Sequence, residues 1–228
     1  MGEDTTEEPA GPVLELAEVS KEYSASGSQV KALSNVSLVV KSPGLFVVLG
    51  PSGAGKTTLL NILGKFIPED ERILVIDETS EIRIEHKNLV RLEARQAQNG
   101  LPAVTIRELL RAALRHHPDR IILGEIRGQE AYELLQLLNT GQSGSLSTLH
   151  APSPEQALAR LTNCVLQGGV DLSYRAIKTS IGHSVNVVIQ LERRPGRRFV
   201  SRVVEIKGFD ADADEFDLSR IFSTEDEA

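Results

Sequence analysis

The sequence predicts an α/β fold with a mainly parallel sheet, preceded by a small antiparallel β segment. From Leu45 onward, short runs rich in Val, Ile and Leu alternate with runs of helical periodicity, which is typical of a parallel sheet with helices on both faces. Before Leu45, two alternating stretches at 13–19 and 30–40 flank the turn-rich SASGSQ and indicate an antiparallel pair. A glycine-rich segment at 50–57 separates the first core strand from the first helix.

The elements of the core follow one another with marked boundaries. Thr105 and Glu108 have the spacing of a capping box, Ser153-Pro154 is a helix start, and Pro195-Gly196 is typical of a turn between strands. The expected order is a strand at 45–49, a helix at 58–66, strands at 73–77 and 89–95, a helix from 105 that stops at Pro118, a strand at 120–126, a helix that ends before Gly141, a strand at 145–150, a helix from 153, and two strands joined at 195–196.

Length and composition fit one large domain, or one domain with a small addition, in a reducing compartment. The chain has 228 residues, 40% of them hydrophobic, which suffices for a sizeable core. No apolar run is long enough to cross a membrane, and the acidic start does not resemble a signal peptide. Cys164 is the single cysteine, which excludes internal disulfides. We therefore expect a cytoplasmic protein without a transmembrane segment.

The net charge of −7 is concentrated at the two ends of the chain. Residues 1–12 carry four acids and no base, and residues 209–228 carry eight acids and Arg220, so the middle has a net charge of +4. Acidic ends of this kind are typical of solvated, flexible tails. The expected segments are a disordered acidic tail at 1–12, the antiparallel β segment at 13–44, the core at 45–208 and an acidic C-terminal tail at 209–228. With 4% aromatic residues and no Trp, nothing indicates direct nucleic-acid binding.

The segment GPSGAGKT has the spacing of a phosphate-binding P-loop, with a strand run before it and a helical run after it. Its backbone N–H groups would point at phosphate oxygens, Lys56 would reach the β- and γ-phosphates, and the Thr57 hydroxyl would bind Mg²⁺. The alternative is a glycine-rich turn beside a solvated lysine. The expected nucleotide-binding residues are Gly50, Pro51, Ser52, Gly53, Ala54, Gly55, Lys56, Thr57 and Thr58.

Acidic residues follow two of the predicted strands, at Asp77-Glu78 and at Glu125, and Glu81 lies one turn beyond the first pair. A P-loop enzyme needs an acid near the γ-phosphate to hold Mg²⁺ or to orient water, so these acids are catalytic candidates and Glu125 is also a metal ligand candidate. The alternative is that each acid stabilises a helix N-terminus. His150 ends another strand and could sense phosphate, although a strand-end histidine can also be structural.

Two arginines, Arg91 and Arg95, alternate with apolar residues in VRLEARQ. They could form one solvated face of a strand. The sharper hypothesis is that one of them acts in trans, at the active site of a neighbouring subunit, to neutralise charge in the transition state.

The ordered series FIPEDERILVIDETSEI, LVRLEARQ, TIRELLRAALRHHPDRIILGEIRG, LLNTGQSGSLSTLHA and DLSYRAIKTSI resembles the secretion-superfamily ATPases of type IV secretion, conjugation and pilus assembly, over about residues 57–209. The resemblance implies a RecA-like P-loop NTPase core, a hexameric ring, and ATP and Mg²⁺ as ligands. It implies a Walker B role for Glu125, a histidine-box role for His150, and acidic-box roles for Asp77, Glu78 and Glu81, although this chain has Asp-Glu where the family usually has Glu-Asp. The arginine-bearing strand of the family matches Arg91 and Arg95.

Residues 13–63 resemble a second family, the nucleotide-binding domains of ABC transporters. This resemblance implies an aromatic residue that stacks on adenine, at Tyr23. The ABC signature LSGGQ is nowhere in the chain, so the residues with which ABC dimers clamp ATP are missing.

Three functions follow from the two resemblances. The first is an ATP-hydrolysing motor subunit, a homo-hexamer that works with inner-membrane components of a secretion or conjugation apparatus and lies in the cytoplasm or at the periphery of the inner membrane. The second is an ABC-transporter-type ATPase subunit. The third is a nucleotide-binding module with little turnover.

Overall fold

The computed structural model describes residues 14–25, 28–40, 44–141 and 144–224. In the first two ranges it describes side chains only at residues 17–20. The α/β fold with a mostly parallel sheet is confirmed.

The described strands form one sheet of ten strands in the order β1-β2-β9-β8-β3-β7-β6-β4-β5, with β10 paired to β9. The six neighbours from β8 to β5 run parallel to one another. The strand bounds are β1 Leu14–Ala25, β2 Ser28–Val40, β3 Leu45–Leu49, β4 Ile73–Asp77, β5 Leu89–Glu93, β6 Arg120–Ile126, β7 Ser145–Leu149, β8 Val185–Arg194, β9 Arg197–Asp210 and β10 Glu215–Ser223.

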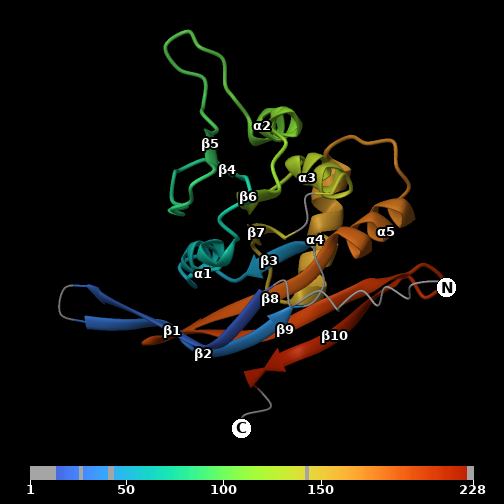
Figure 1. The fold of residues 1–228 in the computed structure, drawn as a ribbon. Coiled ribbons are helices and arrows are strands. Elements are labelled where there is room, and N and C mark those ends of the chain that lie inside the picture. The colour runs from blue at the N-terminus through green and yellow to red at the C-terminus, as the bar shows by residue number, and fades with distance from the viewer. Residues whose placement is uncertain (1–13, 26–27, 41–43, 142–143, 225–228) are drawn as a thin grey trace, which may run out of the picture.

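Helices cover both faces of the parallel strands (Figure 1). On one face α1 packs against β3, in the same core cluster as Phe46 and Val48. On the other face the buried side chains of α2, α3, α4 and α5 belong to one core cluster with Leu45, Val47 and Leu49 of β3. All five side chains of β3 are buried, as expected for a strand with both faces covered. The helix bounds are α1 Lys56–Leu63, α2 Ile106–Ala113, α3 Glu130–Leu138, α4 Pro154–Gln167 and α5 Tyr174–Ser184, with short 3₁₀ turns at Gly64–Phe66 and Leu114–His116.

Side-chain caps fix where three of the helices begin. The predicted capping box is confirmed, because Thr105 accepts from the Glu108 N–H while the Glu108 carboxylate accepts from the Thr105 N–H. Ser153 caps α4, with Pro154 in its first turn, and Ser173 caps α5. These caps satisfy N–H groups that have no partner inside their own helix. The sequence therefore sets these helix starts locally.

The carboxyl ends of the parallel strands meet at one edge of the sheet, where β3 leads into the P-loop, β4 into residues 78–88, β6 into Arg127 and β7 into His150. Ligands of open α/β folds bind at this edge. Residues 94–104 between β5 and α2 form a projecting hairpin with backbone bridges Arg95–Val104 and Gln98–Leu101, and it stands clear of the rest of the molecule at the top of Figure 1.

The N-terminal strands form an antiparallel ribbon, as predicted, but both are longer than predicted. The ribbon joins the main sheet through a parallel bridge between Lys31 of β2 and Arg197 of β9. Residues 14–25 and 28–40 are therefore an extension of the core sheet. Residues 1–12, expected to be a tail, lie outside the described part.

The expected acidic tail at 209–228 is wrong for its described portion. β9 continues to Asp210, and β10 pairs antiparallel with it. Phe216 and Leu218 alternate with exposed Glu215 and Asp217, so β10 is acidic toward solvent and apolar toward the main core. The prediction of a tail used only the net charge of the segment and so missed this alternation.

Candidate functional site

The predicted P-loop connects β3 to α1 and has the backbone that its glycines allow. Gly53 and Gly55 lie in the left-handed region, with φ angles of 73° and 99°, where a side chain would be strained. The Ala54 N–H donates to the Pro51 carbonyl at 3.1 Å and closes the turn. Because α1 begins at Lys56, its first N–H groups lie at the loop. This is the arrangement that binds phosphate groups.

Lys56 lies beneath the loop and is 9% exposed. Its ammonium donates to the carbonyl of Gly50 at 2.8 Å and of Pro51 at 3.3 Å, and lies 3.3 Å from Nε2 of His150. Burial lowers the pKa of Lys56, while the negative charge of Glu125 opposes that shift. The solvated-lysine alternative therefore does not describe Lys56.

His150 connects the lysine to the acid at the end of β6. Its Nε2 lies 3.0 Å from Oε1 of Glu125, whose side chain is 18% exposed. Burial is the main cause that lowers the pKa of His150, and the positive charge of Lys56 adds to it. A neutral imidazole can accept from Lys56 or donate to Glu125, according to its tautomer. Lys56 at the P-loop, His150 just after β7 and Glu125 of β6 thus lie in a row of polar contacts, with His150 in the middle.

Arg127, just beyond β6, holds two acids together. Its Nε donates to Oε2 of Glu125 at 2.8 Å, and its NH1 group donates to Oε2 of Glu78 at 2.7 Å. The hydrogen bond from Arg127 to Glu125 is the main cause that raises the pKa of the arginine. The sequence analysis missed Arg127. Its available signal is the two-residue spacing from Glu125, which places both side chains on the same side of an extended chain.

The neighbouring acids Asp77 and Glu78 point in different directions. The Asp77 carboxylate accepts from the backbone N–H groups of Glu78 at 2.8 Å, Glu81 at 3.0 Å and Ile82 at 3.3 Å, and so holds the turn after β4. A Cβ on Gly124 would lie 2.4 Å from Asp77 Oδ1, so the glycine makes room for this carboxylate. Glu78 is the member of the pair that reaches the other site residues.

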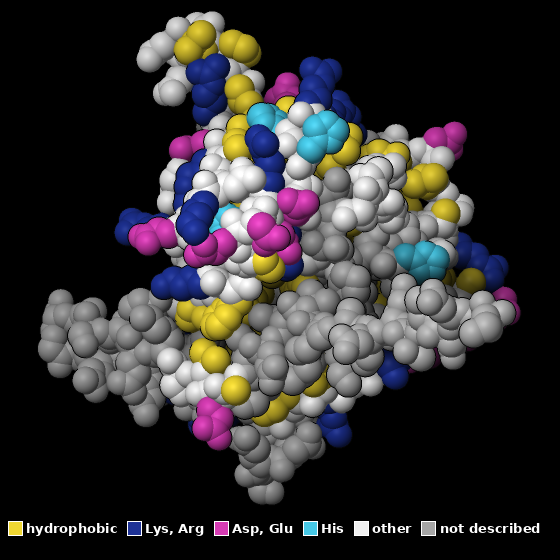
Figure 2. Space-filling model, viewed as in Figure 1, with side chains coloured by type: hydrophobic (Ala, Val, Ile, Leu, Met, Phe, Trp, Pro, Cys, Tyr) yellow, Lys and Arg dark blue, Asp and Glu magenta, His cyan; other side chains and the backbone are white. Residues whose placement is uncertain are grey.

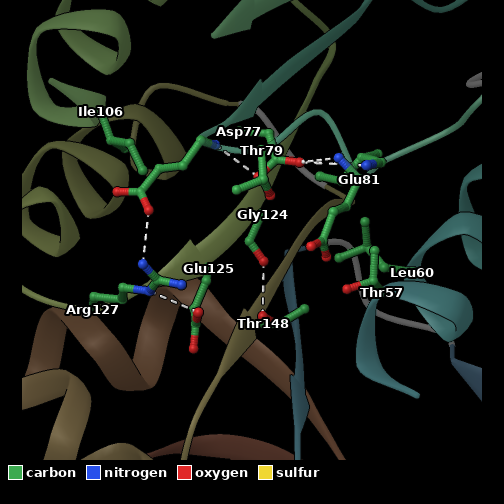
Figure 3. A pocket seen from close by; sticks show the side chains of 12 residues that line it. Thr57, Leu60, Asp77, Thr79, Glu81, Ile106, Gly124, Glu125, Arg127 and Thr148 are labelled. Atoms are coloured by element: carbon green, nitrogen blue, oxygen red, sulfur yellow. Dashed lines mark hydrogen bonds and ion pairs between the residues drawn. The ribbon is translucent and has the colours of Figure 1, made fainter. Parts of the chain in front are cut away.

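A cavity of about 120 Å³ lies between the start of α1 and the ends of β4, β6 and β7. Figure 3 shows Thr57 on one side and Glu125 on the other, with Thr148 bonded to the Gly124 carbonyl between them. Asp77, Glu78 and Glu81 also line this cavity. Thr57 and the carboxylates supply the oxygen ligands that Mg²⁺ prefers. Within the described residues no group of three or more His, Cys, Asp and Glu is arranged as a metal site.

Arg91 and Arg95, the two arginines predicted as candidates to act in trans, make different contacts. Arg91 donates from its NH1 and NH2 groups to the carbonyls of Ile82 at 2.6 Å and Ile84 at 2.7 Å, so its guanidinium fastens residues 78–88 to β5. These bonds favour a structural role for Arg91. Arg95 begins the projecting hairpin and borders a second cavity of about 510 Å³, next to Glu78 and Arg127.

The other predicted nucleotide residues fall into two groups. Pro51 and Ser52 are exposed on the loop, and Thr58 is half-buried on α1. Tyr23 lies in β1, opposite Val30 of β2, but its side chain is outside the described ones. Its predicted contact with adenine therefore stays a prediction.

A family model for type II/IV secretion system proteins matches residues 13–208. The chain belongs to this family. The match includes the N-terminal ribbon, so that segment lies within the secretion family's own boundaries. The similarity of residues 13–63 to ABC transporters stays a resemblance of sequence.

Several curated proteins are similar to this chain. A putative conjugal transfer protein of Mycobacterium tuberculosis is 40% identical over 164 residues, 71% of this chain and 46% of that protein. The type IV secretion system protein PtlH of Bordetella pertussis is 39% identical over 180 residues, 74% of this chain and 51% of that protein. The chain thus spans about half the length of the curated relatives it matches.

Among solved structures, the VirB11 ATPase from the Brucella suis type IV secretion system, in complex with sulphate, matches with a TM-score of 0.64 and 35% identity. The match covers 71% of this chain and 49% of that one. The Legionella pneumophila ATPase DotB, at 22% identity and a TM-score of 0.53, shares the fold. No helix in the described ranges is both long and apolar enough to cross a membrane.

Proposed function

We propose that this member of the secretion family is a Mg²⁺-dependent, ATP-hydrolysing motor subunit of a type IV secretion, conjugal-transfer or pilus-assembly system. The observation that carries the proposal is the contact from Lys56 through His150 to Glu125 at the mouth of a P-loop. This contact joins a phosphate-binding cation to an acid that can orient water. The names of the relatives support the secretion system as the setting.

In the proposed mechanism the loop N–H groups and Lys56 bind the phosphates of ATP. Glu125 orients the attacking water or takes its proton, and His150 reports the γ-phosphate because it contacts both Lys56 and Glu125. Glu78, tied to Glu125 through Arg127, takes the acidic-box role. Asp77 has a structural role, because its carboxylate holds the turn after β4.

Mg²⁺ would be held by the Thr57 hydroxyl, by Glu125 directly or through water, and by the nucleotide phosphates. When bound, it neutralises the charge that develops on the phosphate oxygens. The oxygen-rich cavity between Thr57 and Glu125 supports this assignment. The ion pairs of Arg127 hold Glu125 and Glu78 at that cavity before the ion arrives.

The first test is Lys56→Ala, with Lys65→Ala as the matched control. Lys56 is buried under the loop, and Lys65 is exposed in the 3₁₀ turn that directly follows α1. Loss of the closest cation should abolish tight ATP binding in isothermal titration, whereas the control should bind like the wild type. Equal affinities of both variants and the wild type would overturn the phosphate-binding assignment.

The second test is Glu125→Gln, with the exposed Glu85→Gln as control. The amide keeps the shape of the side chain but cannot accept a proton, so ATP should bind normally while turnover falls at least ~100-fold. If steady-state turnover stays near the wild-type rate, the role passes to Glu78.

A homo-hexamer associated with inner-membrane components is part of the proposal. Sizing of the wild-type protein with and without ATP, together with an ATPase assay, separates it from the two alternatives. A ring with turnover supports the motor, and an ATP-induced dimer supports the ABC-transporter-type subunit. Binding without turnover in any oligomeric state supports the module with little activity.

We also propose that Tyr23 stacks on adenine. A base stacked on an aromatic ring is worth about 1–3 kcal/mol, so Tyr23→Ala should weaken ATP binding by roughly 5-fold to 150-fold, with Tyr23→Phe close to the wild type. If Tyr23→Ala lowers only the melting temperature, the tyrosine is a structural residue of the N-terminal ribbon.

A further inference from the structure

Four arginines surround the turn between β8 and β9, in the sequence ERRPGRRF. The strand register places Arg193 opposite Arg198 and Arg194 opposite Arg197. Like charges directly opposite each other in an antiparallel pair destabilise it. The tip of this hairpin therefore carries a cost in free energy unless its charges meet rings, carbonyls or anions.

On one face of the hairpin, an aromatic ring offsets the repulsion between two of the arginines. The guanidinium carbons of Arg194 and Arg197 lie 5.2 Å and 4.8 Å from the ring centroid of Phe199, and Arg194 also pairs with Glu192 at 3.6 Å. The face of a ring attracts a cation. Arg194 and Arg197 thus have partners that need no ligand.

The other face, which bears Arg193 and Arg198, lies against the P-loop. Arg198 Nε donates to the Gly53 carbonyl at 2.7 Å. A Cβ built on Gly53 would lie only 2.9 Å from the NH1 group of Arg193, so the second guanidinium lies close beside the Gly53 backbone. Within the described part of the chain, neither arginine has a carboxylate at ion-pair distance.

The position of Arg193 matters because Gly53 belongs to the loop whose N–H groups face phosphate. Its side chain is exposed, and it comes from the β8–β9 side of β3, whereas Glu125 belongs to β6 on the other side of β3. An anion on the loop would relieve the repulsion between Arg193 and Arg198, and a guanidinium forms strong charge-assisted hydrogen bonds to phosphate. The bond from Arg198 to the Gly53 carbonyl holds the hairpin in place for that contact.

We propose that Arg193 is a nucleotide-binding residue that contributes a second cation to the phosphates of ATP from within the same chain, and that Arg198 is its positioning residue. The proposal rests on the proposed function, because it assumes that the P-loop holds a nucleoside polyphosphate. It adds a binding residue from the far end of the core, about 140 residues after the loop. It also couples the nucleotide to β9, which bridges to the N-terminal ribbon at Arg197.

The test measures binding of the non-hydrolysable β,γ-imido analogue of ATP to the full chain by isothermal titration. Arg193→Ala should raise the Kd about 10-fold to 100-fold, as expected for loss of a hydrogen bond between charged groups. Arg194→Ala is the matched control, since it removes the same charge from the same hairpin on the face of Phe199, and its Kd should stay within about 2-fold of the wild type. Arg193→Lys should recover part of the affinity because it keeps the charge.

Arg198→Ala and Arg198→Lys test the positioning role. The alanine variant should also weaken binding of the analogue. The lysine variant should restore part of the affinity, because it keeps a charged donor for the Gly53 carbonyl. The melting temperature of each variant without nucleotide is the control for a structural effect. It should stay close to that of the wild type, since all these side chains except Arg198 are exposed at the hairpin tip.

Equal affinity of Arg193→Ala and Arg194→Ala would overturn the inference. If both variants bind the analogue more weakly, the net charge of the hairpin is responsible and not the position of Arg193. If neither does, Arg193 makes no contribution to binding. The inference alone fails if Lys56→Ala loses binding while Arg193→Ala binds like the wild type. If the wild type itself has no measurable affinity, the proposed function fails and the inference fails with it.

Discussion

Asp77 and Glu78 are neighbours in the sequence, yet their carboxylates take part in different interactions. Asp77 accepts three backbone N–H groups, whereas Glu78 pairs with Arg127 and so joins Glu125. The three bonds hold the Asp77 carboxylate against the turn, although both acids line the cavity. The backbone after β4 therefore decides which acid holds the turn and which one pairs with Arg127.

His150 should make the stability of the protein depend on pH. Its pKa in the folded state is below its usual value, mainly through burial and then through Lys56 and Arg160, while Glu125 opposes the shift and Arg127 adds to it. A folded state that binds a proton less readily than the unfolded state loses stability as the pH falls below about 6.5. We therefore expect a lower melting temperature at about pH 5.5 than at about pH 7.5.

The part of this loss that belongs to His150 should disappear in His150→Asn. His183→Asn, on the exposed side of α5, is the control and should keep the wild-type difference between the two pH values. A His150→Asn variant with an unchanged pH difference would show that other groups cause it.

At the scale of elements, β10 shows how composition can mislead. Eight acids in residues 209–228 predict a tail, but Phe216 and Leu218 pack against the main core, and Phe209 and Phe216 form a ring pair with centroids 5.2 Å apart. Lys178 of α5 donates to the carbonyl and carboxylate of Asp214. The turn before β10 is thus bonded to a helix of the core.

A chain that ends after Asp210 should be less stable than one that ends after residue 224. Truncation removes one of the strands paired with β9, three partly buried apolar side chains and the acceptor of Lys178, a loss on the order of 3 kcal/mol. Urea unfolding of the two chains measures the difference. Equal midpoints would mean that residues 211–224 behave as the tail that their charge predicts.

At the scale of the whole molecule, the projecting hairpin at residues 94–104 makes few contacts with its own chain. Figure 2 shows it standing out at the top of the molecule with hydrophobic side chains near its tip, and Leu101 is 52% exposed. An exposed apolar tip is suited to contact with another subunit. Arg95, at the base of this hairpin, is therefore the better candidate to act across a subunit boundary.

Mixing experiments should distinguish the two arginines. Combining Arg95→Ala with Glu125→Gln should restore some ATP turnover, because mixed rings would contain interfaces with one intact site. Arg91→Ala should instead lower the melting temperature, because Ile82 and Ile84 lose a shared donor. The absence of recovery with Arg95→Ala in mixed oligomers confirmed by sizing would assign Arg95 to its own chain.

Much of the fold and part of the site could be predicted from the sequence because they depend on local patterns. The strand at 45–49, the capping box at Thr105 and the turn at 195–196 follow from neighbouring residues alone. The P-loop belongs to the same class, since its glycines and Lys56 act within eight residues. The positions of Glu125 and His150 followed from one further rule, that parallel strands end at a common edge.

The remaining features depend on residues far apart in the sequence. Arg127 reaches Glu78 across 49 residues, and Arg198 reaches Gly53 across 145. No local pattern records which arginine meets which carbonyl or carboxylate, because sheet order and hairpin register set these distances. The sequence therefore determined the elements, their order along the chain and the chemistry available at the sheet edge. Strand pairing and packing decided which acid pairs with Arg127, which arginine holds a loop and which two arginines lie beside the P-loop, because those choices depend on distances in space.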